Sequence, residues 1–295
     1  MKYYLSLSVL ALFVCGACLD SSEEDLDLAA PTISFAAAAT AIAPTHFSDI
    51  SADASSIPLS FSVADDKGIS EIVLESHNGF DGHVHGRSVN NDFILFRYRH
   101  TILNEDLTNP FYFESRGDAD PTIFLDERNP LVPEDMLPLA GPYHFSIRAV
   151  DVSGNETSYN DNSTYHTTIN LQRHYAPQVR MTDVDRVNGT VNGTVQRNEE
   201  HEAASDIVFL WVSVITPDPS SPQREGDFQA EWLWGESNWP HQFRVDSGAP
   251  LPDAQNIDLA ELLNDESAIR AMTEADRLRV WAEDKNGNIS VKTFQ

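Results

Sequence analysis

Apolar and polar residues alternate along several short runs of this chain, which is the pattern of β-strands with one buried face. Two of the clearest runs are 57–63 and 143–150. In the second run, the alternation places Phe145 and Ile147 on the inner face and His144 on the outer face.

Further strands are expected in the same half of the chain, at 70–76, 93–98 and 164–171, with turn residues between them. The run 70–76 leads directly into a histidine-rich stretch, so His77 is expected at the end of a strand. A short strand is also expected at 122–125, within a long irregular segment.

The pattern of the first half recurs in the second half. The run 207–214 matches the run 57–63, and the segment 277–290 matches the segment 145–158. The last two segments are both alternating strands followed by an acidic residue and a Gly-Asn pair. We interpret this as an internal duplication with a period of about 140 residues.

Short alternating strands with turn residues between them favour antiparallel sandwiches over a parallel sheet. We therefore expect an all-β fold of two tandem Ig-like antiparallel β-sandwich modules, at residues 31–173 and 174–295. One helix is expected in the second module, because Leu259, Leu262 and Leu263 have helical spacing.

The N-terminal segment has the features of a lipoprotein export signal. Residues 1–17 carry one lysine and then an apolar run that is too short to span a bilayer. Two small residues precede Cys18, which resembles a bacterial lipobox with Cys18 as the lipidation site, although Cys15 replaces the usual leucine. Residues 18–30 form an acidic tether typical of Bacteroidetes surface lipoproteins. We expect a lipid anchor in the outer membrane and exposure at the cell surface. The alternative is an ordinary cleaved signal that leaves a free cysteine.

The charge of the chain limits its partners. It has 46 Asp and Glu residues against 19 Lys and Arg residues, for a formal net charge of −27. Such a surface repels phosphate backbones, so nucleic acid is not expected as a partner. The same surface attracts cations. The sequence has no nucleophile elbow, phosphate loop or HExxH motif, and we expect no enzymatic activity.

The densest group of potential metal ligands in the chain lies between residues 75 and 86. This stretch contains His77, Asp81, His83 and His85. Its glycines would let the imidazoles turn toward a common point, and zinc or copper accepts three or four such ligands. Asp81 could be a ligand or could orient an imidazole. His144 or His100 could complete the site, whereas the alternative is a solvated polar loop.

Two further features have both a structural and a functional interpretation. The segments 151–155 and 284–288 could be calcium loops, but a hairpin turn with Gly or Asn at positive φ explains both. All five tryptophans lie in the second module. Trp232 and Trp234 could form an exposed platform for a sugar or a protein, or they could pack in the core.

Four ordered segments of the first module resemble the domain of unknown function 4625 family, lipoproteins found chiefly in Bacteroidetes. These segments are 64–69, 77–85, 141–145 and 151–156, and the resemblance covers about residues 31–172. It implies an Ig-like β-sandwich and no settled activity. It also implies that the family tends to keep His77, Asp81, His83, His85 and His144. The second module has only His174, His201 and His241, and so lacks the cluster.

Together these features favour a surface lipoprotein that captures a zinc or copper ion or hands it over to an outer-membrane transporter. The alternative is a non-enzymatic binding module for a glycan or protein partner, built on the tryptophan-rich second module.

Overall fold

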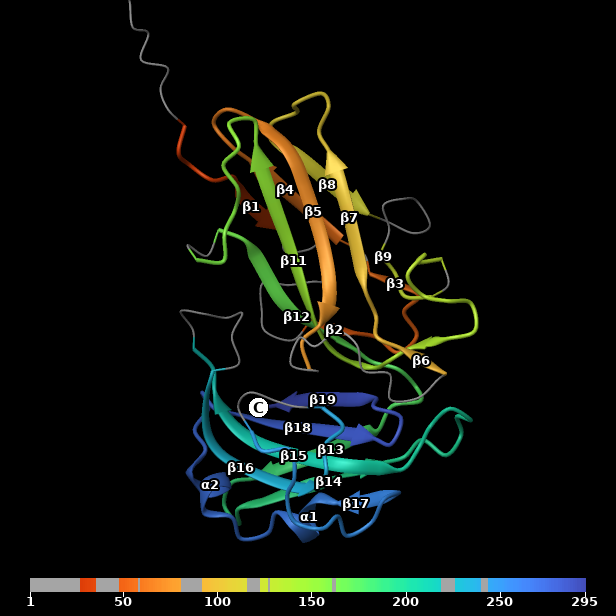
Figure 1. Ribbon diagram of the computed structural model, residues 1–295. Coiled ribbons are helices and arrows are strands. Elements are labelled where there is room, and N and C mark those ends of the chain that lie inside the picture. The colour runs from red at the N-terminus through yellow and green to blue at the C-terminus, as the bar shows by residue number, and fades with distance from the viewer. Residues whose placement is uncertain are drawn as a thin grey trace, which may run out of the picture.

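Strands make up nearly all of the regular structure of this chain, so the fold is all-β (Figure 1). The computed structural model describes residues 27–35, 48–57, 59–80, 92–115, 123–126, 128–160, 163–218, 226–239 and 244–295. Among these residues, every strand pair lies within 32–171 or within 178–294. We refer to residues 27–171 as the N-terminal half and to residues 172–295 as the C-terminal half.

The N-terminal half is built on a five-stranded sheet in the order β2-β12-β11-β5-β7 and a three-stranded sheet in the order β1-β4-β8. Two smaller pairs, β10-β6 and β3-β9, lie beside them. The strands are β1 (Thr32–Phe35), β2 (Ser48–Ile50), β3 (Ser56–Ile57), β4 (Leu59–Ala64), β5 (Ile69–Asn78), β6 (Phe93–Ile94), β7 (Tyr98–Leu103), β8 (Phe111–Ser115), β9 (Ile123–Phe124), β10 (Leu137–Pro138), β11 (Gly141–Asp151) and β12 (Tyr165–Leu171).

The C-terminal half contains a four-stranded sheet in the order β16-β15-β18-β19 and a three-stranded sheet in the order β13-β14-β17. Its elements are β13 (Gln178–Asp185), β14 (Thr190–Gln196), β15 (Ile207–Thr216), β16 (Asp227–Gly235), β17 (Asn256–Asp258), α1 (Leu259–Leu262), α2 (Ser267–Ala271), β18 (Arg277–Asp284) and β19 (Ile289–Phe294). The helix α1 lies within the predicted segment and begins where the Asp258 carboxylate accepts a hydrogen bond from Ala260 N at 2.9 Å.

The structure confirms most of the predicted strands and corrects two predictions. The run 93–98 is not one strand, because residues 95–97 form no strand and the two flanking strands have different partners. The chain instead leaves β6 and enters β7 in a different sheet. The sheets are also not wholly antiparallel, because β2 pairs with β12 and β6 with β10 in parallel.

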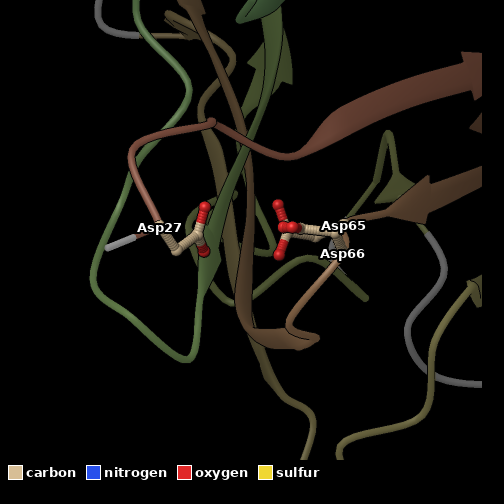
Figure 2. A group of neighbouring side chains, drawn as sticks. All are labelled: Asp27, Asp65 and Asp66. Carbon is tan, nitrogen blue, oxygen red and sulfur yellow. The ribbon is translucent and has the colours of Figure 1, made fainter. Parts of the chain in front are cut away.

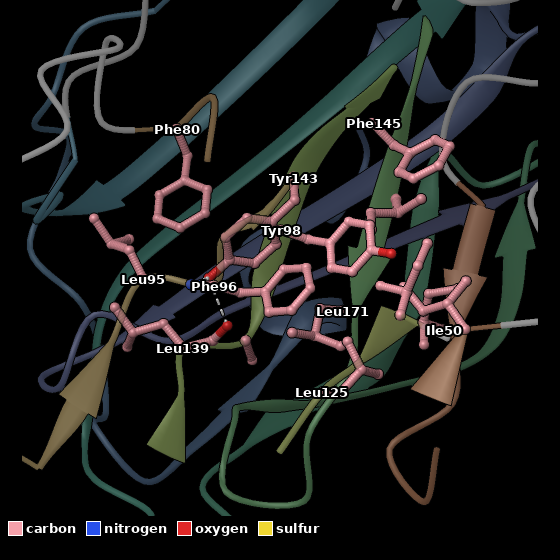
Figure 3. Close-up of a cluster of buried hydrophobic side chains, with 14 of the residues drawn as sticks. Ile50, Phe80, Leu95, Phe96, Tyr98, Leu125, Leu139, Tyr143, Phe145 and Leu171 are labelled. Carbon is pink, nitrogen blue, oxygen red and sulfur yellow. Dashed lines mark hydrogen bonds between the residues drawn. The ribbon is translucent and has the colours of Figure 1, made fainter. Parts of the chain in front are cut away.

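The core of the N-terminal half surrounds Tyr143, whose side chain is fully buried in β11 (Figure 3). Its hydroxyl donates a hydrogen bond to Leu139 O at 2.8 Å and accepts one from Phe96 N at 3.2 Å. A buried hydroxyl without partners would be costly, so these two bonds satisfy the only polar group of the ring. They also fix the irregular segment around Phe96 against β11.

The two halves meet at the end of the N-terminal half where β11 begins. Ala140 N donates to Asn288 Oδ1 at 3.1 Å, and Ile289 N donates to Ala140 O at 2.9 Å. Asn170 Nδ2 donates to Val291 O at 2.7 Å. Buried apolar residues of both halves belong to one continuous cluster, so the halves form a packed interface. We call this contact region the junction.

The two Gly-Asn turns have the same local structure, which confirms the hairpin-turn interpretation. The carboxylate of Asp151 accepts hydrogen bonds from Asn155 N at 2.8 Å and from Asn155 Nδ2 at 2.7 Å. The carboxylate of Asp284 accepts them from Asn288 N at 2.8 Å and from Asn288 Nδ2 at 3.0 Å. Each turn is therefore organised by the hydrogen bonds of its own carboxylate.

The surroundings of these two turns differ, and so do their carboxyl groups. A Cβ on Gly154 would meet nothing within 4 Å, whereas the Asp284 turn is covered by the N-terminal half at the junction. Burial raises the pKa of Asp284 to about 7, against the opposing hydrogen bonds from Asn288. At Asp151, burial also acts to raise the pKa, but the hydrogen bonds from Asn155 outweigh it, so the pKa of this carboxyl is lowered.

These shifts predict opposite pH dependences of stability. The raised pKa of Asp284 means that its contribution is complete below about pH 3.8 and is lost as the pH rises through about 7. Relative to Asp284→Asn, the wild type should lose up to about 4 kcal/mol of unfolding free energy between pH 4 and 8. Relative to Asp151→Asn, it should instead lose stability as the pH falls below 4. Urea unfolding of the wild type and both variants, from below pH 4 to pH 8, measures the two effects. Changes of the same sign with pH would contradict the prediction.

Candidate functional site

His77 and His144 face each other across the β5–β11 ladder of the five-stranded sheet. They are direct partners in the antiparallel register. Their ring centroids lie 5.5 Å apart at an interplanar angle of 77°. His77 is half-buried and His144 is exposed. The sequence thus predicted correctly that His77 lies at a strand end and that His144 faces outward.

The inner face of the same two strands explains why both imidazoles point outward. Leu74 pairs with Ile147 on the inner face, and both side chains are fully buried. Because successive residues alternate between faces, His77 and His144 must lie on the opposite side, toward solvent. The apolar pattern that builds the core therefore also positions the histidine pair.

The other histidines of this sheet do not join the pair. His100 in β7 is the partner of Leu74, so it lies on the inner side of an edge strand, and its ring stacks with Tyr98. The prediction that His100 could complete the site is therefore wrong. His166 lies on the outer face of β12 but is the partner of Ser146, and its ring contacts Tyr159.

Gly79 brings the chain close to the His144 ring immediately after β5. A Cβ at this position would lie 2.4 Å from His144 Nε2. Such a distance is shorter than a van der Waals contact, so glycine is required for the close approach. The sequence showed this glycine only as a loosening of the backbone and gave no sign of the contact with His144.

The other predicted site residues lie outside the described residues. These are Asp81, His83 and His85, together with the predicted lipidation site Cys18. The described structure therefore brings together two members of the predicted ligand set, His77 and His144. Two imidazoles on neighbouring strands can share one ion, because zinc–nitrogen bonds of about 2.0–2.1 Å place two such rings a few ångströms apart.

A second group of potential ligands in the N-terminal half consists of three aspartates (Figure 2). One carboxylate oxygen from each of Asp27, Asp65 and Asp66 lies within 4.8 Å of the others. Asp65 and Asp66 lie in the turn between β4 and β5, where Asp65 Oδ1 accepts hydrogen bonds from Lys67 N and Gly68 N. These turn contacts account for Asp65, and we assign no function to the group.

The tryptophans mostly belong to the core. Trp211, Trp239 and Trp281 are almost completely buried, as the core-packing interpretation predicts. Trp232 and Trp234 are half-buried against the second apolar cluster, which is the core of the C-terminal half. They do not form a freely exposed aromatic platform.

The fold and the outward-facing histidine pair define an all-β protein with a candidate metal site. The chain belongs to the family described as "Domain of unknown function (DUF4625)", whose model matches residues 17–165. This match confirms the resemblance inferred from the sequence. No curated protein matches the chain.

Several solved structures are similar to the chain at low identity. A tetra-tandem repeat in the extending region of a large adhesion protein is 13% identical, with a TM-score of 0.27, over 90% of this chain and 50% of that chain. The fibronectin(III)-like modules of Clostridium thermocellum CbhA are 11% identical, with a TM-score of 0.19, over 89% of this chain and 92% of that chain. Dimeric latent PorU from Porphyromonas gingivalis is 13% identical, with a TM-score of 0.26, over 93% of this chain and 21% of that chain.

These similarities carry no functional assignment, because the identities and TM-scores are low. The chain spans about half the length of the adhesion-protein structure that it matches. Among the residues that the structure describes, no helix has the length and apolar character needed to cross a bilayer.

The contact between Gly79 and His144 predicts the effect of a single added methyl group. In Gly79→Ala, the His144 ring must move away from the new Cβ, which changes its position relative to His77. Zinc affinity of the chain should fall at least about tenfold, as for other changes that reorient a ligand. Thermal unfolding without metal should change little, because the ring that must move is exposed. Calorimetric zinc titration and circular dichroism check both effects, and wild-type affinity in the folded variant would contradict the prediction.

Proposed function

We propose that this chain is a non-enzymatic surface lipoprotein whose N-terminal module binds a zinc or copper ion. In this proposal, residues 31–173 and 174–295 are two tandem Ig-like β-sandwich modules. The separate strand ladders of the two halves and their matching Gly-Asn turns support the tandem arrangement.

The observation that carries the metal proposal is the cross-strand pair of His77 and His144. The two rings are 5.5 Å apart on the solvent-facing side of a sheet whose inner side is a packed core. A rigid sheet is a favourable scaffold for metal ligands, because their separation is fixed before the ion binds. Neutral imidazole suits zinc and copper, which distinguishes this site from an oxygen-ligand site for calcium or magnesium.

Two imidazoles do not complete the shell of a zinc or copper ion. The sequence supplies further candidates in Asp81, His83 and His85, which follow His77 within nine residues. We propose that this segment contributes the remaining ligands, with Asp81 either binding the ion or orienting an imidazole.

The proposed role is capture of the ion at the cell surface, or its handover to an outer-membrane transporter. The net charge of −27 favours the approach of cations and disfavours nucleic acid. A lipid on Cys18 would hold the chain at the outer membrane. A lipid anchor and an acidic tether are consistent with a protein that works close to a membrane partner.

The second candidate function is a binding module for a glycan or a protein partner. It depends on the aromatic residues of the C-terminal half. Because Trp232 and Trp234 are half-buried, each ring offers only part of its surface to a ligand. The histidine pair therefore supports metal binding more strongly than the tryptophans support this alternative.

Substitution of the paired histidines tests the metal proposal. In the chain from residue 18 onward, His77→Ala and His144→Ala should each weaken zinc or copper binding at least about tenfold, because each removes a ligand. His166→Ala is the matched control, because His166 lies on the same outer face but is paired with Ser146. This variant should bind the metal as the wild type does. Calorimetric titration at neutral pH measures the affinities.

Two outcomes would contradict the proposal. One is a wild-type chain with no measurable affinity for either metal. The other is a loss of affinity that is equal in all three variants. Binding should also weaken as the pH falls, because an imidazole must be deprotonated to bind a metal.

A further inference from the structure

Phe80 links the proposed metal site to the junction between the halves. It follows His77 by three residues, and its side chain is 3% exposed. Its ring lies edge-on to Tyr143 at a centroid distance of 5.3 Å and edge-on to Trp239 at 4.9 Å. Tyr143 belongs to the same half, as Figure 3 shows, whereas Trp239 belongs to the C-terminal half. The chain that leaves the histidine pair is therefore held between the two halves.

Trp239 is a rigid partner for this ring. Its side chain is fully buried, and its Nε1 donates a hydrogen bond to Gly287 O at 2.9 Å. The preceding residue, Asn238, donates its backbone N–H to Glu283 Oε2 at 2.8 Å. Glu283 in turn pairs with Arg244 at 3.0 Å, with both side chains fully buried. Breaking any of these buried contacts would leave a polar group unsatisfied, so Trp239 has one well-defined position.

A short series of contacts connects Phe80 with the His144 ring. Gly79, next to Phe80, lies so close to this ring that a Cβ on it would be 2.4 Å from His144 Nε2. Tyr143, which Phe80 contacts, is the neighbour of His144 in β11. Gly141 is also enclosed, because a Cβ on it would lie 3.2 Å from Phe80 and 3.4 Å from Ile289 of the C-terminal half. We therefore expect a displacement of Phe80 to move the end of β5 relative to His144.

We propose that the C-terminal half controls the zinc or copper affinity of the His77–His144 site by holding Phe80 against Trp239. This inference rests on the metal site proposed above. Phe80 and Trp239 are positioning residues, since neither touches the ion. The C-terminal half, which lacks a histidine cluster, thus has a function in the site of the other half. Because linkage is reciprocal, the bound metal must also strengthen the contact of Phe80 with Trp239.

The test compares two variants of the contact with a control in which another tryptophan is replaced by alanine. In the chain from residue 18 onward, Trp239→Ala and Phe80→Leu should each weaken zinc binding about tenfold, the range seen when a supporting residue of a ligand is removed. Trp232→Ala removes a tryptophan of the same half that packs on the second cluster, away from the junction, and should retain wild-type affinity. Circular dichroism without metal identifies any variant that does not fold. If Trp239→Ala does not fold, Phe80→Leu still tests the contact, because leucine keeps an apolar side chain at this position.

A second measurement separates positioning from general stability. Saturating zinc should slow hydrogen exchange of the Trp239 indole N–H at least about fivefold in the wild type and leave it unchanged in His77→Ala. Wild-type zinc affinity in folded Trp239→Ala and Phe80→Leu would overturn this inference and leave the metal site in place. Equal weakening in Trp232→Ala would overturn it as well. If the wild type binds neither zinc nor copper, the proposed function and this inference fall together.

Discussion

The register between β5 and β11 determines which side chains of the five-stranded sheet enter the core and which face solvent. It pairs Leu74 with Ile147 on the inner face and His77 with His144 on the outer face. A shift of one residue would exchange the two faces of β5, burying His77 and exposing Leu74. The buried apolar residues make such a shift very unfavourable, because each large apolar side chain contributes about 1.5–3 kcal/mol when it leaves water. Packing of the core therefore fixes the geometry of the candidate site without any direct selection of the imidazole positions.

The junction gives the C-terminal half a structural connection to the same site. One continuous apolar cluster runs from the core around Tyr143 to Trp211 and Trp281 in the C-terminal half. Phe80 enters this cluster three residues after His77. In many tandem proteins the contacts between modules are small and polar, and the modules move independently. Here the contact is apolar and hydrogen-bonded, which is the basis for the proposed coupling of the C-terminal half to the end of β5.

Much of the fold could be predicted from alternation and apolar content. β4 buries alternate side chains, whereas β11 and β15 bury residues on both faces. The prediction was wrong for 93–98, where residues 95–97 form no strand and the two flanking strands have different partners. The outward position of His144 followed from its neighbours, but its pairing with His77 required the register, which depends on contacts between distant residues. The contacts of Phe80 with Trp239 and of Gly79 with His144 were not predictable, because nothing in the local sequence of either residue marks its partner.

The most direct test of the central claim is to observe the two imidazoles while metal is added. Nuclear magnetic resonance of the ring nitrogens can follow His77 and His144 separately, with His166 as an internal reference. The account predicts that both rings change together as one equivalent of zinc is added, and that neither then takes up a proton as the pH is lowered until the metal is released. Rings that keep their metal-free signals, or that respond no more than His166, would contradict the claim that this pair binds a metal ion.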